Sequence, residues 1–166
     1  MDNPIKVFNS YKRALEPFVP LEDGRVGMYV CGMTVYDYCH IGHARAMITF
    51  DVIYRYLRHR GYEVTFVRNH TDVDDKIIAR ANELGEDPLV LSARFIQALD
   101  DDLAGFGLLP PTVQPKVSEH IPQILATIQA IVDNGHGYAV DGDVFFHVPS
   151  LGRYGYLSGR DVNKSR

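Results

Sequence analysis

The order of apolar segments between residues 25 and 67 constrains this chain more than any other feature of its sequence. An apolar run of strand length at 25–30 precedes a polar loop, a segment with helical spacing, and a β-rich run at 63–67. The apolar residues of the helical segment recur at steps of four, three and four: Ala46, Phe50, Ile53 and Leu57. In a parallel sheet, such a unit places its first loop at the carboxyl edge, where ligands of open α/β sheets bind. The order therefore predicts an α/β fold with a ligand site in the first loop.

The loop before the helix carries residues that suit an anion site. His40 and His43 flank Gly42 where the helix begins, and a helix N-terminus offers free backbone N–H groups and a partial positive charge. Gly42 has no β-carbon, so a flat ring or a phosphate can approach the backbone closely. Two imidazoles there indicate donors for an anion whose charge grows during reaction, such as a phosphoryl oxygen. The alternative is an ordinary loop-to-helix junction; Arg45, one turn further on, has either a solvated or a functional role.

The two cysteines, Cys31 and Cys39, are too few for a disulfide scaffold. In a reducing compartment, each is either a buried apolar side chain or a metal ligand. One arrangement is a local zinc site of both thiols with His40 and His43. That arrangement is disfavoured because the adjacent Cys39 and His40 would have to converge on one ion.

Polar residues also follow the second strand directly, so they too are expected on the carboxyl edge. Asp72 is a candidate N-cap of the next helix, and Asp74 and Asp75 place negative charge in its first turn. Capping explains much of this acidic cluster and is favoured over a metal site built from the three aspartates. It does not explain Thr71.

Length, charge and hydropathy limit the range of functions. A length of 166 residues fits one domain, or one domain plus part of another. The net charge of −4 gives no global sign of a nucleic-acid-binding surface, which is usually basic, but it is compatible with a small-molecule site. No apolar run approaches the roughly 18 residues of a spanning helix, and the N-terminus lacks a signal-peptide pattern. We expect a soluble cytoplasmic protein with no membrane partner.

Further elements are predicted on both sides of the strand–helix–strand unit. Gly- and Pro-rich residues 105–115 are expected to form a loop between subdomains. Turn, cap and periodicity signals place the other elements: a hairpin at 6–9 and 16–19, helices at 77–84, 87–103 and from 118 to 135, and a hairpin turning at 141–142.

Two stretches together resemble cysteinyl-tRNA synthetases, a family of class I aminoacyl-tRNA synthetases. Residues 29–45, YVCGMTVYDYCHIGHAR, are similar to the extended HIGH signature of that family. Residues 67–76, VRNHTDVDDK, are similar to its strand-end motif, usually written RNITDIDDK. His70 departs from the pattern, because the family usually has an apolar residue there. The resemblance runs from about Val7 to about Arg160, with both specific blocks in the right order.

The resemblance implies a Rossmann-like nucleotide-binding catalytic domain, the first half of which would cover residues 1–115. Residues 116–166 would begin a connective insertion made of a helix and a β-hairpin. Three of the family's four zinc ligands, its KMSKS loop and its helical tRNA-binding domains have no counterpart in the sequence, and 163–166 only faintly echo the KMSKS loop. We therefore expect a truncated or partly observed piece of a longer enzyme, inactive by itself.

The implied function is that of a cysteine–tRNA ligase. ATP, with Mg²⁺, and L-cysteine would form cysteinyl-adenylate and pyrophosphate, and the cysteinyl group would then pass to tRNA(Cys). By resemblance, His40 and His43 are the catalytic pair that binds the ATP phosphates, and Thr71 lies beside the bound amino acid. The other residues implied to bind ATP or substrate are Gly32, Thr34, Tyr36, Asp37 and Gly42.

The resemblance also assigns the two thiols. Cys31 would be one of four Zn²⁺ ligands, with the substrate thiolate in the open position, which explains how cysteine is distinguished from serine. Cys39 matches no ligand position and is assigned to the core.

Two alternative functions stay open. Cysteine ligases of mycothiol synthesis share the implied fold and also activate cysteine but pass it to an amino sugar, and such a reaction is one alternative. The other is a free-standing, non-catalytic synthetase paralogue that binds a nucleotide or a protein partner. The presence of His40, His43 and Thr71 argues against the paralogue, whereas the missing half argues for it.

Overall fold

The computed structural model describes residues 4–160, which divide into two compact units. The first is continuous, Pro20–Ile121, and contains every residue predicted to form the site. We call it the 20–121 unit. The second combines the described parts of Met1–Val19 and Pro122–Arg166. Residues 163–166, which echo the KMSKS loop in the sequence, lie outside the described residues.

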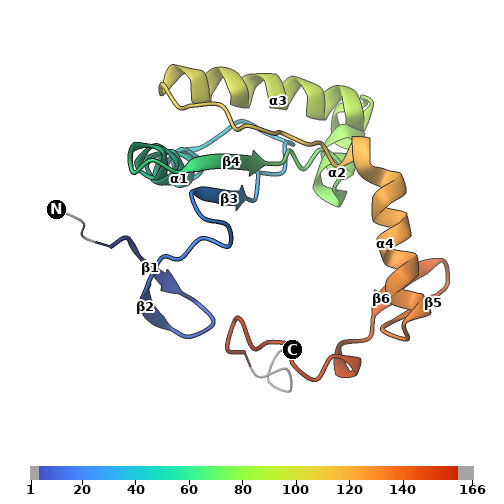
Figure 1. Cartoon of the computed structure of the whole chain (residues 1–166). Helices are drawn as coiled ribbons and strands as arrows, with labels where there is room; N and C mark the ends of the chain where they lie inside the picture. Colours follow the sequence, from blue (N-terminus) through green and yellow to red (C-terminus); the bar gives the residue numbers. More distant parts are fainter. Residues whose placement is uncertain (1–3, 161–166) are drawn as a thin grey trace. The chain divides into compact units, whose positions relative to one another are not determined.

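The 20–121 unit is built on a parallel βαβ arrangement. Strand β3 (Arg25–Val30) is followed by helix α1 (Ile41–His59) and strand β4 (Glu63–Arg68). The strands pair in parallel, from Arg25 opposite Glu63 to Val30 opposite Arg68 (Figure 1). The predicted strand–helix–strand order and its parallel pairing are confirmed.

Backbone pairing continues on both sides of β4. Beyond the end of β3, the Val35 N–H donates to the Thr71 carbonyl at 3.2 Å. On the other side of β4, the Arg68 N–H donates to Val113 at 3.1 Å, and the His70 N–H donates to Pro115 at 2.9 Å. Proline has no N–H but retains its carbonyl acceptor. The stretch expected to be a loop at 105–115 is irregular after the end of α3, and its last residues run parallel to β4 through isolated bridges.

Two further helices complete the unit, α2 (Asp75–Leu84) and α3 (Pro88–Gly105). Asp74, rather than Asp72, caps α2, because its side chain accepts from the Lys76 N–H. Asp87 caps α3 as predicted, accepting from the N–H groups of the next turn. Gly85 ends α2 in the left-handed conformation with φ of 68°, a geometry that glycine adopts without steric cost.

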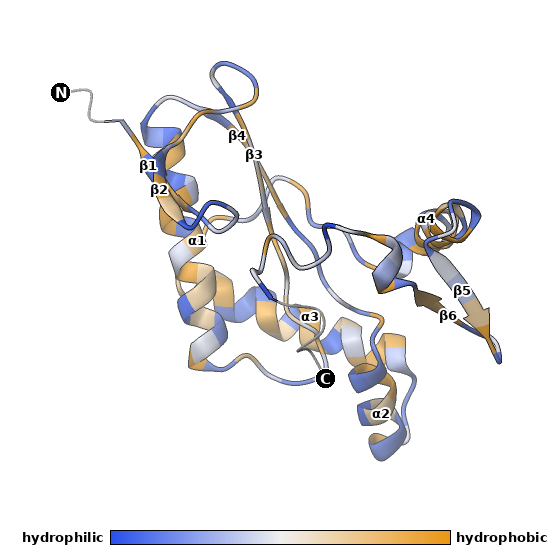
Figure 2. Cartoon of the chain, turned by 90° about the horizontal axis from the view of Figure 1, so that it is seen from below, coloured by the Kyte–Doolittle hydropathy of each residue, from blue (hydrophilic) through white to orange (hydrophobic). Residues whose placement is uncertain are grey.

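The main apolar core of the unit lies between the loop after β3 and the three helices. Its buried members are Met33, Val35, Met47, Ile77, Ala81, Leu91, Phe95, Leu99 and Leu103. Figure 2 shows apolar and polar residues alternating around α1, α2 and α3, as expected for helices with one buried face.

The buried face of α1 differs from the predicted one. Its buried residues are Ala44, Met47, Asp51, Tyr54 and Leu57, so only Leu57 of the predicted stripe is buried. The difference centres on Asp51, which is 7% exposed and accepts hydrogen bonds from Arg55 Nε at 2.6 Å and the Leu109 N–H at 2.9 Å. A buried carboxylate in the middle of the core face hides the helical period from a search for apolar residues.

The second unit contains two antiparallel hairpins and a helix. Strands β1 (Lys6–Asn9) and β2 (Ala14–Pro17) form one hairpin, and β5 (Gly137–Val140) and β6 (Asp143–Phe146) form the other. Helix α4 (Ile121–Asp133) follows the short 3₁₀ helix η1 (Ser118–His120), and η2 covers Val148–Ser150. The positive φ angles of Asp141 and Gly142, 51° and 94°, fit the tight turn predicted at this position.

None of the helices in the described part of the chain has the length and apolar character that crossing a membrane requires.

Candidate active site

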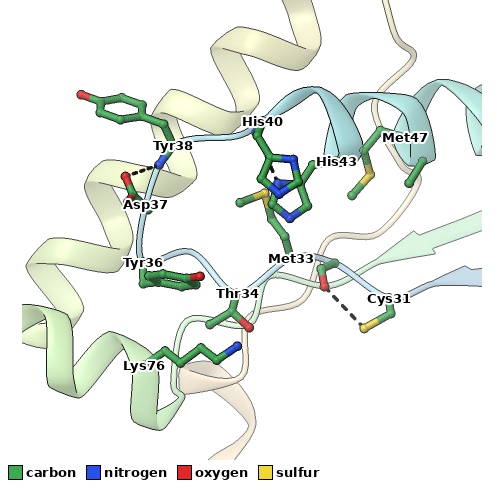
Figure 3. Close-up of a pocket in the computed structure, with 12 residues that line it drawn as sticks. Cys31, Met33, Thr34, Tyr36, Asp37, Tyr38, His40, His43, Met47 and Lys76 are labelled. Carbon is green, nitrogen blue, oxygen red and sulfur yellow. Dashed lines mark hydrogen bonds between the residues drawn. The ribbon is translucent and has the colours of Figure 1, made fainter.

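A cavity of about 470 Å³ lies at the carboxyl end of β3, next to the N-terminus of α1 and the start of α2 (Figure 3). The cavity is large enough for a small-molecule ligand. Seven of the nine residues predicted from the sequence line it: Cys31, Gly32, Thr34, Tyr36, Asp37, His40 and His43. The other two, Gly42 and Thr71, are not among the lining residues.

His40 and His43 form a reciprocal cap at the first turn of α1. The Gly42 N–H donates to His40 Nδ1 at 3.1 Å, and the His40 N–H donates to His43 Nδ1 at 3.4 Å. An imidazole nitrogen that accepts a hydrogen bond carries no proton, so each neutral ring holds its proton on Nε2. The two rings stack with their centroids 3.8 Å apart. The cap therefore gives the pocket two Nε2–H donors on adjacent rings.

The charge state of His43 follows from its surroundings. Burial lowers the pKa of His43 below its usual value of 6.5, and the proximity of His40 lowers it further. His43 is therefore neutral at pH 7 and acts as a hydrogen-bond donor rather than as a fixed cation. The side chain of His40 also occupies the Gly42 N–H, so this backbone donor is not free for an anion as the sequence suggested.

Two glycines permit close approaches within the site. A β-carbon on Gly32 would lie 1.6 Å from the Asn69 carbonyl oxygen, so the two strand ends can meet only if residue 32 has no side chain. A β-carbon on Gly42 would lie 2.8 Å from His40 Cε1. The flat ring that approaches Gly42 in this structure is thus the imidazole of the cap itself.

Thr71 lies behind the pocket. Its carbonyl accepts from the Val35 N–H, and its N–H donates to the Met33 carbonyl at 3.4 Å. Its hydroxyl accepts from Asn69 Nδ2 at 3.1 Å. Thr71 therefore holds the loop that carries the pocket residues against the end of β4.

The cysteines occupy different environments. The Cys31 thiol is exposed at the edge of the pocket and donates to the Gly32 carbonyl at 3.4 Å. Cys39 is half-buried against the main core, as predicted, and burial, together with the negative charge of Asp102, raises the pKa of its thiol. Within residues 4–160, no three His, Cys, Asp or Glu side chains are arranged to hold a metal ion. The described residues therefore supply one zinc-compatible thiol but not a complete tetrahedral site.

Comparison with known proteins identifies the family. The family described as the catalytic domain of class I (C) tRNA synthetases matches residues 17–166, nearly the whole chain. The chain belongs to this family of class I tRNA synthetases. The resemblance found in the two sequence blocks is thereby confirmed.

Several relatives are similar over almost all of this chain. The cysteine–tRNA ligases of Trichlorobacter lovleyi and Geobacter sulfurreducens are 54% and 56% identical to it, over 96% of the chain and 33% of each relative. The chloroplastic/mitochondrial cysteine–tRNA ligase of Arabidopsis thaliana is 56% identical, over 95% of the chain and 28% of that protein. The chain thus spans about a third of the length of these synthetases.

In this class I synthetase chain, five residues that sequence reasoning did not assign to the site also line the pocket: Met33, Tyr38, Ala46, Met47 and Lys76. Met33 and Met47 belong to the apolar core, so burial alone accounts for their sequence character. Lys76 had a signal, because it closes the second motif block and follows the N-cap of α2.

Three other polar residues of that block, Arg68, His70 and Asp72, are buried. Arg68 is 6% exposed and donates to Met47 Sδ at 3.7 Å, and burial lowers its pKa while Asp100 opposes the shift. His70 is 3% exposed, with Nε2 3.8 Å from Asp100 Oδ1 and Nδ1 without a hydrogen-bond partner. Asp72 accepts from both the N–H and the hydroxyl of Ser118, so it ties the start of η1 to the end of β4.

Proposed function

We propose that this chain is the nucleotide- and cysteine-binding part of a cysteine–tRNA ligase. The relatives that support this activity are named for it, and they match 95–96% of the chain. The reaction would join the carboxylate of L-cysteine to the α-phosphate of ATP, releasing pyrophosphate, and then pass the cysteinyl group to tRNA(Cys). The observation that carries the proposal is the pair of Nε2–H donors that the His40–His43 cap presents to the pocket.

The residues of the pocket would act by binding and orientation. His40 and His43 would donate to phosphoryl oxygens of ATP and stabilise the charge that grows there as the carboxylate attacks. Thr34, Tyr36 and Asp37 would shape the space for the nucleoside and the amino acid. Asp37 already uses Oδ1 to accept from the Tyr38 N–H at 2.8 Å, which holds this part of the loop.

Three predicted residues would act indirectly or at the edge. Gly32 and Thr71 would position the loop, and Gly42 would leave room for the capping ring. Cys31 would supply one ligand to a zinc ion whose other ligands come from outside the described residues. Bound zinc would distinguish a thiolate from a hydroxyl, because soft thiolate ligands suit zinc and a hydroxyl does not.

The finer architecture belongs to the same proposal. The parallel pairing of β3 and β4, with 113–117 alongside β4, supports the first half of a Rossmann-like domain over residues 1–115. Helix α4 and the β5–β6 hairpin support the beginning of a connective insertion over 116–166. Mg²⁺ would accompany ATP. The cytoplasmic location stays a prediction, since the relatives include proteins named for the cytoplasm and for organelles.

The test is cysteine-dependent exchange of pyrophosphate into ATP by the full natural product of the gene. We expect exchange in the wild type, and a loss of about 10²–10³-fold in His40→Asn. Asparagine is a good N-cap, so this variant keeps an acceptor for the first turn of α1 while losing the Nε2–H donor. A stability measurement on the same sample separates loss of the donor from loss of the helix.

Two outcomes would count against the proposal. If the wild type binds ATP but shows no exchange with cysteine, the non-catalytic paralogue is the better description. If exchange occurs and His40→Asn retains it in full, the histidine cap is not the source of catalysis.

A further inference from the structure

Lys76 lies at the mouth of the proposed ATP site without an assigned role. It is the only lysine or arginine among the residues that line the pocket. Its side chain runs from α2 beneath the Tyr36 ring toward Thr34 (Figure 3), and Nζ lies 5.8 Å from the ring centroid. In the view of Figure 3, Thr34 and Tyr36 lie between Lys76 and the two histidines, and all five residues line the cavity.

The ammonium group of Lys76 has no acidic partner among residues 4–160, since no carboxylate oxygen of these residues lies within 4.0 Å of its Nζ. Other basic side chains of the same unit do have such partners: Arg25, Arg55, Arg80, Arg94 and Lys116. Unlike these residues, Lys76 faces a cavity and keeps its positive charge available for an anionic ligand.

Helix stability does not account for a lysine at this position. Lys76 is the second residue of α2, and a positive charge in the first turn opposes the helix dipole. Its backbone N–H is already satisfied by the Asp74 side chain at 2.9 Å. The residue thus contributes nothing to the helix that a neutral side chain would not.

The pocket needs a positive charge if it is to bind a polyanion. His43 is neutral at pH 7 because burial lowers its pKa, and Asp37 adds a carboxylate to the lining. A neutral imidazole can direct a hydrogen bond to a phosphate oxygen, but it does not neutralise the charge of a triphosphate. A flexible lysine does so as a point charge, and its four-carbon side chain can reach different phosphates.

We propose that Lys76 binds phosphate oxygens of ATP, from the wall of the pocket opposite the Nε2–H groups of His40 and His43. This inference rests on the proposed function and adds a further substrate-binding residue to it. The contact of Nζ with the Tyr36 ring would keep the lysine extended over the cavity before ATP arrives.

The experiment measures dissociation constants for ATP, adenosine and L-cysteine by equilibrium dialysis, using the full natural product. We expect Lys76→Gln to bind ATP about tenfold or more weakly, since a charge-assisted contact to phosphate is lost. Lys76→Arg should stay within about threefold of wild type, because it keeps the charge. Adenosine affinity should be unchanged in both variants. Lys116→Gln is the matched control, since Lys116 pairs with Glu119 and does not line the pocket.

The outcomes separate this inference from the proposed function. If the wild type binds neither ATP nor cysteine, the proposed function is wrong and the role of Lys76 falls with it. If the wild type binds ATP and Lys76→Gln binds it equally well, only the role of Lys76 is wrong. Equal losses for ATP and adenosine would show a structural effect, and a loss confined to L-cysteine would show that Lys76 binds a carboxylate instead.

Discussion

The two motif blocks lie at the carboxyl ends of neighbouring parallel strands, yet the polar residues of the first block mostly line the pocket and those of the second mostly do not. The loop after β3 and the first turns of α1 supply eleven of the twelve residues that line the pocket, whereas the segment after β4 supplies only Lys76. In that second segment, Asn69 and Asp72 instead accept hydrogen bonds from backbone N–H groups of Gly32 and Ser118. His70 is buried with its ring beside Asp100.

The comparison shows that polar residues at a strand end can hold a neighbouring loop in place rather than bind a ligand. Asn69 and Thr71 do this for the loop after β3. Asn69 Oδ1 accepts from the Gly32 N–H and from the Tyr29 hydroxyl, both at 2.9 Å. Thr71 adds backbone pairing to the same loop. The first block contains most of the residues that we propose to bind ATP and cysteine. The second block holds the loop that carries them in position.

The largest effect is expected at the closest point between the two segments. Gly32→Ala would force a β-carbon against the Asn69 carbonyl, which is backbone and cannot move aside, so the free energy of unfolding should fall by about 3 kcal/mol or more. Gly27→Ala is the matched control, because Gly27 lies in the strand that leads to Gly32 and has nothing within 4 Å of the added carbon. Urea unfolding of both variants checks this. Equal, small effects would show that the segments separate at little cost.

The free energy of unfolding should depend on Asp72 more than on Asp74. Asp72→Ala removes the acceptor for two donors of Ser118 at a buried site, and should lower the free energy of unfolding by about 2 kcal/mol. Asp74→Ala removes only the cap of α2, at a cost of about 1 kcal/mol. Urea midpoints of the two variants measure the difference. The reverse order would mean that the Asp74 cap stabilises the fold more than the hydrogen bonds between Asp72 and Ser118.

Buried His70 should make the free energy of unfolding depend on pH. Burial lowers the pKa of His70 below its usual 6.5; Asp100 and Asp72 oppose this shift, whereas Arg68 and Lys116 add to it. Above pH 6.5 both folded and unfolded chains hold a neutral ring, so its contribution is complete. As the pH falls below 6.5 the unfolded chain binds the proton first, and stability falls by at most about 1.4 kcal/mol per pH unit.

His70→Ile removes this group and introduces the type of residue usual in the family. Urea unfolding of the wild type and the variant at pH 7.5 and pH 5.5 measures the effect. We expect the wild type to lose more stability than the variant over this interval. Parallel losses in the two proteins would assign the acid sensitivity to other groups.

The smallest effect is expected at the pocket itself. His40→Asn should change the free energy of unfolding by only a few tenths of a kcal/mol, because asparagine can cap α1, whereas His40→Ala should cost about 1 kcal/mol. Thermal unfolding of the two variants provides the measurement. A large loss of stability in His40→Asn would show that the stacked rings of His40 and His43 stabilise the fold as well as lining the pocket.

Sequence reasoning reached the order of elements and most of the site for identifiable reasons. The β3 strand, the stop at Gly85 and the Asp141–Gly142 turn depend on local backbone preferences, which neighbouring residues determine. The histidine pair follows from its place at a helix start. Seven of nine predicted residues line the pocket because they belong to one continuous loop.

The differences arise where distant partners decide the outcome. The buried face of α1 depends on Asp51, whose partner Leu109 is 58 residues away. The role of Asp72 depends on Ser118, and the pairing of Val113 depends on β4. Lys76 escaped assignment because a lysine on a helix is ordinarily solvated, and only the cavity beside it distinguishes it.

The reciprocal cap of His40 and His43 links the hydrogen-bond donors of the pocket to the first turn of α1. His43 presents Nε2–H only while its Nδ1 accepts the His40 amide, so a proton gained at His43 Nδ1 would release the start of α1 at the same moment as it alters the donor array. Because burial lowers the pKa of His43, this release requires more acid than protonation of an exposed histidine does.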